Sequence, residues 1–142
     1  MARIKLDIPK SFTFQATIPI RITDINYGGH AGNDSILSII HEARVQFLKQ
    51  WDCDEKNFFG TGLIMSDVAI NFKKEIFYGD LLQVSVAMRD FEKISFDIVY
   101  KIDVIKDART ETVATAKTGM VCYDYTTRKI TTVPEEAQKK GL

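Results

Sequence analysis

One segment with the apolar spacing of a helix stands alone in a sequence that otherwise alternates between apolar and polar residues. Between residues 33 and 51, apolar side chains recur at helical intervals, with Ile36, Ile40, Ala43 and Phe47 on one stripe. Further apolar residues widen this stripe, so we expect the helix to be buried on more than one side. A single helix of this kind has to be covered by whatever the rest of the chain forms.

The remaining segments alternate in the way that half-buried strands do. One such segment precedes the helix and the others follow it. Pro19 lies in the first one and cannot donate a ladder hydrogen bond, so we expect that strand at the edge of a sheet. The expected strands are residues 12–22, 67–73, 82–88, 94–102 and 111–125, and a short helix is expected near residues 135–140.

This order predicts an α+β domain in which a five-stranded antiparallel sheet folds over the long helix, the strands after the helix forming a meander. The 142 residues amount to one domain, and no linker or repeat interrupts them, so we expect residues 1–142 to form a single domain. Such a sheet has open edges and one face that no helix covers. Pairing with further copies of the chain would cover both, and we expect a homodimer or a homotetramer.

The charge balance excludes some classes of partner. Nineteen basic and nineteen acidic residues give a net charge of zero, so no overall positive field would hold nucleic acid or an anionic membrane. Cys53 and Cys122 form neither a metal-type spacing nor a disulfide framework, which suits a reducing compartment. No signal peptide or transmembrane stretch is evident, so we expect a cytoplasmic protein that does not associate with membranes.

The chemistry-bearing side chains concentrate in a glycine-rich turn just before the helix. Asp24, Asn26, His30 and Asp34 lie there within eleven residues. Glycines in such a turn allow a ligand to approach the backbone closely. The free N–H groups of the first helical turn can then hold a developing negative charge. The turn is therefore the candidate active site.

Each of these side chains also has a purely structural interpretation. Asp24 and Asn26 are good turn formers that bond to nearby backbone amides. Asp34 is either a helix cap that suits the helix dipole or a carboxylate that activates water. His30 lies in a polar turn and not on an apolar stripe, which favours contact with a ligand. His41 inside the helix is interpreted as part of a buried polar network with Glu42 and Arg44.

Several other site types are not indicated. The two histidines are not spaced as metal ligands around a carboxylate base, so no metal site is expected. The sequence contains no nucleophile elbow, phosphate loop or dinucleotide fingerprint. Lys73, Lys74 and Arg89 either face solvent or meet the phosphates of a nucleotide-bearing ligand.

The turn and its surroundings resemble the hotdog-fold thioesterases, in particular the 4-hydroxybenzoyl-CoA and acyl-CoA thioesterase branch. The family signature D-x-D-xx-GH-V-N-N has its counterpart in residues 24–34, DINYGGHAGND, and the family's helical A-R pair in Ala43-Arg44. Residues 78–84, YGDLLQV, resemble a G-D-x-L-x-V strand start. The likeness extends from about residue 12 to 125 and implies the hotdog fold.

One position departs from this family pattern. The second aspartate of D-x-D, which the resemblance implies as the catalytic carboxylate, is Asn26 in this chain. Asp34 replaces it as the base, or Asn26 and His30 hold water while helix N–H groups polarise the carbonyl, or the site has become a non-catalytic binding site. We favour the first explanation, with His30 and Asn26 as orienting groups.

The sequence therefore predicts an acyl-CoA thioesterase that releases a free acid and CoA. The predicted catalytic residues are Asp34, His30 and Asn26, and the thioester carbonyl is expected near Gly29, Gly32 and Asn33. The acyl-CoA itself supplies the CoA handle, so no cofactor is expected. A non-catalytic protein that binds acyl-CoA or acyl carrier protein is the alternative, and a hotdog dehydratase is third.

Overall fold

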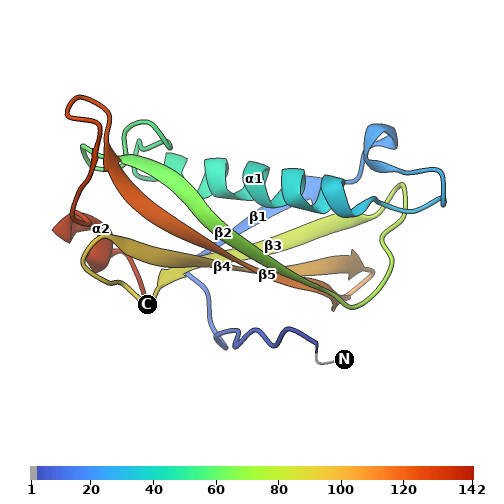
Figure 1. Cartoon of the computed structure of the whole chain (residues 1–142). Helices are drawn as coiled ribbons and strands as arrows, with labels where there is room; N and C mark the ends of the chain where they lie inside the picture. The colour runs from blue at the N-terminus through green and yellow to red at the C-terminus, as the bar shows by residue number, and fades with distance from the viewer. Residues whose placement is uncertain (1–2) are drawn as a thin grey trace.

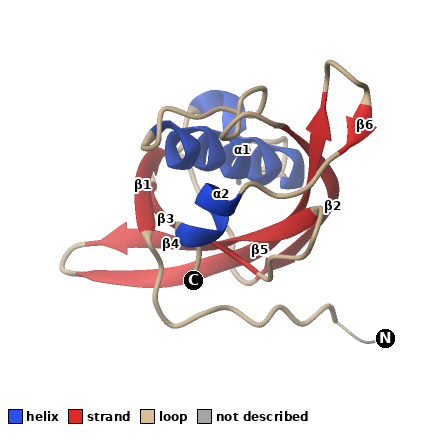
Figure 2. Ribbon diagram, turned by 90° about the vertical axis from the view of Figure 1, so that its left-hand side faces the viewer, coloured by secondary structure: helices blue, strands red, loops and turns tan. Residues whose placement is uncertain are grey.

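A long helix lies along the concave face of a curved antiparallel sheet, and the sheet wraps around it (Figures 1 and 2). This computed structural model describes residues 3–142. The predicted α+β architecture, one long helix wrapped by an antiparallel sheet, is confirmed. The elements in chain order are β1 (Phe14–Pro19), the 3-10 turn η1 (Ile22–Asp24), α1 (Asn33–Lys49), β2 (Gly62–Phe72), β3 (Leu81–Arg89), β4 (Ser95–Lys106), β5 (Arg109–Asp124), β6 (Lys129–Ile130) and α2 (Glu135–Lys139).

The strand order across the sheet is β1-β3-β4-β5-β2, with the two-residue β6 paired to β5. The predicted meander is correct for β3, β4 and β5 but wrong for β2. β2 pairs with β5, so that Phe72 lies opposite Ala114, while β1 takes the place beside β3. β1 is therefore an edge strand, as Pro19 predicted. Alternation along a strand determines which face each side chain occupies, but it carries no information about which strand lies next to which.

The apolar stripe of α1 fills the space that the sheet encloses. Ile36, Ile40, Ala43 and Phe47 are all buried, as the helical spacing predicted. The expected burial on more than one side is wrong, because the buried residues share one face and Leu37 and Val45 are exposed. At the C-terminal end of α1, the ring of Phe47 lies 5.8 Å from that of Phe14 on β1 and 4.9 Å from that of Trp51. Burying each large side chain contributes about 1.5–3 kcal/mol. These contacts fix α1 over β1 and β3, with its N-terminus at one end of the sheet.

A polar network crosses this apolar core. Arg44 is only 6% exposed, and its Nε donates to Glu55 Oε1 at 2.7 Å. Its Nη1 donates to the hydroxyl of Tyr100 at 3.2 Å, and this hydroxyl lies 2.8 Å from Thr118 Oγ1. The network links α1, the segment after it, β4 and β5. The predicted buried network of His41, Glu42 and Arg44 is correct only for Arg44. Its carboxylate is Glu55, Glu42 accepts from Gln46 instead, and His41 meets Glu55 from outside with its side chain 57% exposed.

The charge of Arg44 is maintained inside the core by its partners. Burial alone would lower the pKa of Arg44, but Tyr100 and Glu55 together raise it above its ordinary value. Burial also raises the pKa of Tyr100, which keeps its hydroxyl protonated. A charged guanidinium and a neutral phenol therefore satisfy one another where no water reaches them.

We expect Arg44→Ala to lower the free energy of unfolding by about 2 kcal/mol. This is less than the ~3–5 kcal/mol for a fully buried pair, because Glu55 remains partly exposed. His41→Ala is the control, since its exposed ring meets the same carboxylate at 3.4 Å and should change the free energy by about 0.5 kcal/mol or less. Urea unfolding followed by circular dichroism measures both. Equal effects for the two variants would contradict a structural role of the buried guanidinium.

Candidate functional site

The turn that carries most of the predicted site residues is built on Asp24. This residue is 4% exposed, and its Oδ2 accepts the backbone N–H of Arg21 at 2.8 Å. The Arg21 guanidinium also contacts the carboxylate, with Nη2 3.3 Å from Oδ1. The backbone carbonyl of Asp24 accepts the N–H of Gly32 at 3.1 Å. Asp24 therefore closes the turn from both sides, which confirms its structural interpretation.

Asn26 shapes the tip of the same turn. Its side-chain Oδ1 accepts the N–H of Gly28 at 2.9 Å, and its carbonyl accepts the N–H of Gly29 at 3.1 Å. Its own N–H donates to the carbonyl of His30 at 2.9 Å. Gly29 has a φ of 85°, a left-handed conformation that a side chain disfavours. Asn26 thus uses its oxygen atoms for the turn and leaves its amide nitrogen for other contacts.

Asn26 and Asp34 converge over Gly32. A Cβ placed on Gly32 would lie 2.5 Å from Asp34 Oδ1 and 3.7 Å from Asn26 Nδ2. Only glycine fits at this position without displacing the carboxylate. On the other side of Asn26, a Cβ placed on Gly28 would lie 3.1 Å from Asn26 Oδ1 and 3.4 Å from His30 Nε2. The three predicted catalytic side chains therefore follow one another around the turn.

Helix α1 begins directly after this turn, at the predicted position. Gly32 is its N-cap residue, and no side chain caps the helix. The N–H groups of Gly29 and Gly32 already donate to carbonyls of the turn. The N–H groups of the first helical turn, starting at Asn33, have no partner within the helix because of helical geometry. They remain as the donors that a negatively charged oxygen would meet.

The imidazole of His30 is oriented by the backbone. Its Nδ1 lies 3.2 Å from the carbonyl oxygen of Ala31. A carbonyl can only accept, so Nδ1 carries the proton and Nε2 carries the lone pair in the neutral ring. Nε2 lies 4.0 Å from Glu75 Oε1. The ring nitrogen with the lone pair therefore faces a carboxylate from a distant part of the chain.

His30 and Asn33 open into a cavity of about 230 Å³. Its floor is mostly apolar and comes from three separate parts of the chain: the start of α1, the end of β2 with the segment after it, and β5. The rim is charged. The lining residues are His30, Ala31, Asn33, Ile36, Phe72, Lys73, Lys74, Glu75, Ile76, Val113 and Ala114.

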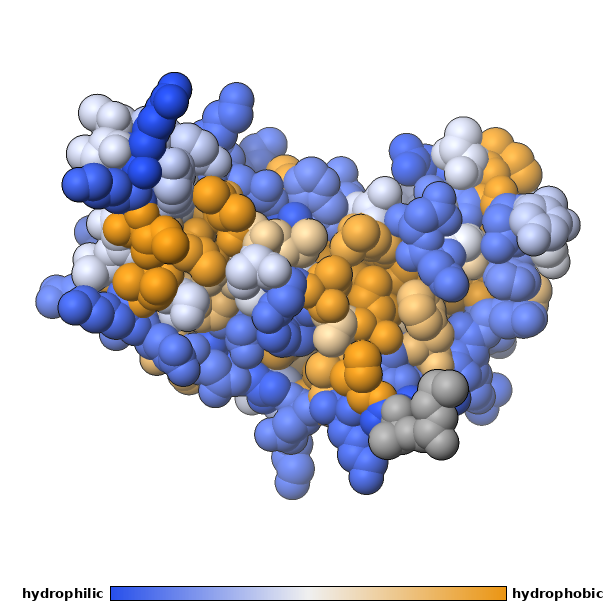
Figure 3. Space-filling model, viewed as in Figure 1, coloured by the Kyte–Doolittle hydropathy of each residue, from blue (hydrophilic) through white to orange (hydrophobic). Residues whose placement is uncertain are grey.

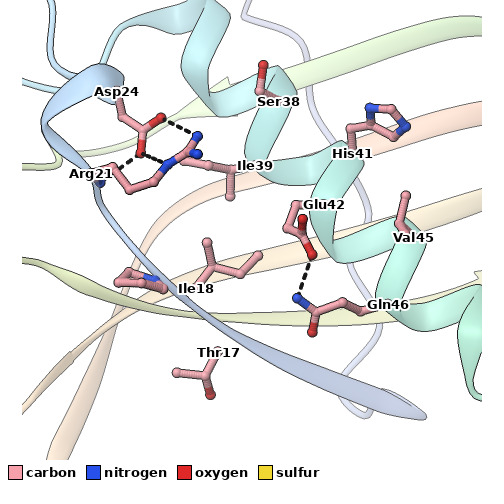
Figure 4. Close-up of a pocket in the computed structure, with 11 residues that line it drawn as sticks. Thr17, Ile18, Arg21, Asp24, Ser38, Ile39, His41, Glu42, Val45 and Gln46 are labelled. Carbon is pink, nitrogen blue, oxygen red and sulfur yellow. Dashed lines mark hydrogen bonds and ion pairs between the residues drawn. The ribbon is translucent and has the colours of Figure 1, made fainter.

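A second cavity, of about 390 Å³, lies between α1 and β1 (Figure 4). The Arg21–Asp24 ion pair stands at one end of this cavity, and the Glu42–Gln46 hydrogen bond lies along the helix. Ile18 and Ile39 provide apolar surface between them. None of the six predicted site residues lines it. The smaller cavity at the start of α1 is therefore the candidate active site.

The structure places only some of the predicted site residues on the wall of the cavity. His30 and Asn33 line the cavity, whereas Asn26 and Asp34 lie beside it over Gly32. The sequence pattern did not indicate Glu75 or the apolar floor that Phe72, Ile76 and Ala114 provide. The one local signal was the break in alternation at residues 73–75, where three charged residues follow each other. Their position beside His30 depends on strand pairing, which local pattern does not show.

Within residues 3–142, no three His, Cys, Asp or Glu side chains come together as a metal-binding group. Over the same residues, no helix has the length and apolar character needed to cross a membrane. Cys53 and Cys122 are both free thiols, as expected.

Comparison with known proteins gives one consistent group. The model of the thioesterase-like superfamily matches residues 20–141. A 1,4-dihydroxy-2-naphthoyl-CoA hydrolase of Microcystis aeruginosa is 32% identical over 119 residues, which are 82% of this chain and 83% of that protein. The enzyme of the same name from Nostoc punctiforme is 28% identical over 129 residues, covering 89% of this chain and 83% of that protein.

Solved structures support the same fold. A 1,4-dihydroxy-2-naphthoyl-CoA thioesterase from Synechocystis superposes with a TM-score of 0.78 at 22% identity, covering 89% of this chain and 93% of that one. A thioesterase from Thermus thermophilus in complex with coenzyme A and zinc also gives 0.78, at 18% identity, covering 92% and 98%. The expected hotdog fold is thereby confirmed.

We expect Asp24→Ala to lower the free energy of unfolding by about 1–3 kcal/mol, because the part-buried N–H of Arg21 loses the buried carboxylate that accepts it. Asp24→Asn is the matched control. Its side-chain oxygen can still accept that N–H, so it should recover much of the loss. Thermal and urea unfolding measure both variants. Identical stability of Asp24→Ala and the unmodified protein would contradict the scaffold role.

Proposed function

The chain belongs to the thioesterase-like superfamily, and from this premise we propose that it hydrolyses an acyl-CoA with a compact aromatic acyl group. The predicted activity class, hydrolysis of an acyl-CoA thioester to a free acid and CoA, is confirmed by curated relatives that are hydrolases of a CoA thioester. The non-catalytic alternative is therefore not retained.

The observation that carries the proposal is the apolar cavity at the start of α1. Its volume of about 230 Å³ is below the roughly 300–1,000 Å³ of sites that enclose a drug-sized ligand. Such a cavity suits the acyl group alone, with the CoA portion outside. A flat bicyclic group such as 1,4-dihydroxy-2-naphthoyl, which the relatives named above act on, matches a small cavity with an apolar floor.

The proposed catalytic side chains are Asp34, His30 and Asn26. The imidazole would take the proton of a water molecule, the Asp34 carboxylate would hold the Asn26 amide, and this amide would orient the carbonyl. The thioester oxygen would lie against the first N–H groups of α1, beginning with Asn33, where fixed donors stabilise the negative charge of a tetrahedral intermediate. The N–H groups of Gly29 and Gly32 already donate within the turn, so they are not available to the substrate. These two glycines would contribute by allowing the thioester to come close to the backbone.

The basic residues at the rim of the cavity support binding of the CoA portion there. The backbone N–H groups of Lys73 and Lys74 both donate to the carbonyl of Val113, at 2.9 and 3.1 Å, which anchors this segment. Lys74 also pairs with Glu111, and this contact lowers the pKa of that carboxyl. Lys73 would then be the more available cation for a CoA phosphate. With a CoA substrate and two free thiols, the proposed compartment is the cytoplasm.

We also propose that a second copy of the chain pairs along β2. β2 is an open edge eleven residues long, and its apolar residues Ile64, Met65, Val68 and Phe72 are each about 40% exposed. Figure 3 shows apolar side chains gathered on one face of the molecule. An open apolar edge favours pairing with another strand. Phe72 also lines the cavity, so a partner that pairs with β2 would cover the open side of the cavity.

A thioester panel tests the function. We expect 1,4-dihydroxy-2-naphthoyl-CoA and benzoyl-CoA to be hydrolysed with a kcat/KM at least about tenfold above that for palmitoyl-CoA, because a long chain cannot enter the cavity. Release of free thiol measures the rate, and acetyl-CoA controls for the CoA portion alone. Failure to release thiol from every member would refute the proposal. A preference for palmitoyl-CoA would refute the compact acyl group.

A charged side chain introduced on the β2 edge tests whether two copies of the chain pair there. In a symmetric pair, Val68→Lys places two like charges near each other, so we expect the variant to become a 16.1 kDa monomer. Val45→Lys on the exposed side of α1 is the control, since its side chain is similarly exposed. Light scattering gives the masses. A wild-type monomer at all concentrations would exclude the assembly, and an unchanged Val68→Lys oligomer would exclude this edge.

A further inference from the structure

Glu75 is a carboxylate on the wall of the candidate active site that the sequence did not indicate. Its Oε1 lies 4.0 Å from Nε2 of His30, and both residues line the 230 Å³ cavity. The side chain is 64% exposed, so its contact with His30 contributes little to stability. A role in folding therefore does not account for its position.

The position of Glu75 is set by the backbone on both sides of it. The N–H of Ala31 donates to the carbonyl of Ile76 at 2.7 Å, which joins the residue after Glu75 to the residue after His30. The N–H groups of Lys73 and Lys74 are held by Val113. Two short segments, far apart in the sequence, are thus fixed side by side. The carboxylate faces the imidazole because the backbones are joined, not because the side chains attract each other.

The two facing atoms are both acceptors. His30 Nδ1 donates to Ala31, so Nε2 of the neutral ring has a lone pair, and the Glu75 carboxylate has only lone pairs. A separation of 4.0 Å is too long for a direct hydrogen bond. Two hydrogen bonds of about 2.8 Å that meet at one water oxygen span such a distance. The water would direct one hydrogen to each acceptor and its own lone pairs into the cavity.

We propose that Glu75 is a catalytic residue that, together with His30, holds the hydrolytic water. This inference rests on the proposed thioester hydrolysis and names the proton acceptor within it. In the attack, the water oxygen forms a bond to the thioester carbon and one water proton passes to His30 Nε2. The carbonyl electrons move to the oxygen, which the first N–H groups of α1 stabilise.

The tetrahedral intermediate formed in this attack then breaks down to the products. The carbonyl re-forms, the C–S bond breaks, and the CoA thiolate leaves with the bonding electron pair. The thiolate takes the proton from His30 Nε2, which returns the ring to its neutral form. The products are the acid and the CoA thiol. The second water hydrogen stays on the attacking oxygen and becomes the proton of the acid. Glu75 accepts a hydrogen bond from it and stabilises the positive charge that His30 carries in between.

The other charged groups near His30 fit this assignment. Lys74 is paired with Glu111, and Lys73 lines the same cavity, toward the proposed CoA phosphates. Asp34 comes from α1 and lies over Gly32, on the far side of Asn26. The sequence offered Asp34 as the base. In this inference Asp34 instead faces the Asn26 amide, and the water belongs to His30 and Glu75.

The test compares three variants with the wild type. We expect Glu75→Gln and His30→Gln each to lower kcat about 100-fold with KM changed less than about threefold, within the usual range for general-base groups. Asp34→Asn should stay within about tenfold of the wild type. Glu92→Gln, a similarly exposed glutamate on the β3–β4 turn, is the matched control and should be unchanged.

Two further measurements separate a chemical role from a structural one. Formate should restore part of the activity of Glu75→Ala, since a small carboxylate can occupy the same position. Nitrogen NMR should show that the ring of His30, one of two histidines in the chain, keeps its Nδ1 proton in Glu75→Gln. A changed tautomer would mean that Glu75 only orients the ring, which would overturn the water-holding role.

The outcomes distinguish this inference from the proposed function. If Glu75→Gln keeps wild-type kcat while Asp34→Asn loses activity, the inference is wrong, the base is Asp34, and the protein remains a thioester hydrolase. If the wild type releases no thiol from any acyl-CoA of the panel, the proposed function fails, whatever the variants do.

Discussion

The enclosure of α1 by the sheet is the constraint on which the rest of the structure depends. The helix carries one broad buried face, and no second long helix is present among the described residues to cover it. A curved sheet is the remaining way to remove this apolar surface from water (Figure 2). Because the sheet curves around α1, the N-terminus of the helix comes to rest beside the ends of β2 and β5, where the cavity forms.

The polar elements of the interior and of the site are held by different means. Arg44 is held by a buried network that joins α1 to β4 and β5, and each of its partners would be costly to leave unpaired. The site residues are held mainly by backbone hydrogen bonds: Asp24 with Gly32, Asn26 with Gly29, Ala31 with Ile76. Partly exposed side chains thereby acquire defined positions without contributing much to stability. This leaves their chemistry free to be used on a substrate.

The same arrangement explains how a thioesterase-like chain functions with an asparagine at the position that the family resemblance assigned to a carboxylate. Asn26 still closes the turn with its side-chain oxygen, so the fold of the site is preserved. Two other carboxylates lie within this small region. Asp34 approaches Asn26 from the helix, and Glu75 approaches His30 from the segment after β2. In the proposed site, a carboxylate near in space thus replaces the one that is absent from position 26.

The sequence by itself determined the main helix, the main strands and where the candidate site was sought. The apolar stripe predicted α1, Pro19 predicted an edge strand, and the glycine-rich turn before the helix marked the site, since these signals are local and depend on residues a few positions apart. The strand order, the Glu55 partner of Arg44 and the approach of Glu75 to His30 were decided only by the tertiary structure. Each of these joins residues eleven or more positions apart, and alternation fixes the face of a side chain without identifying its neighbour on the next strand.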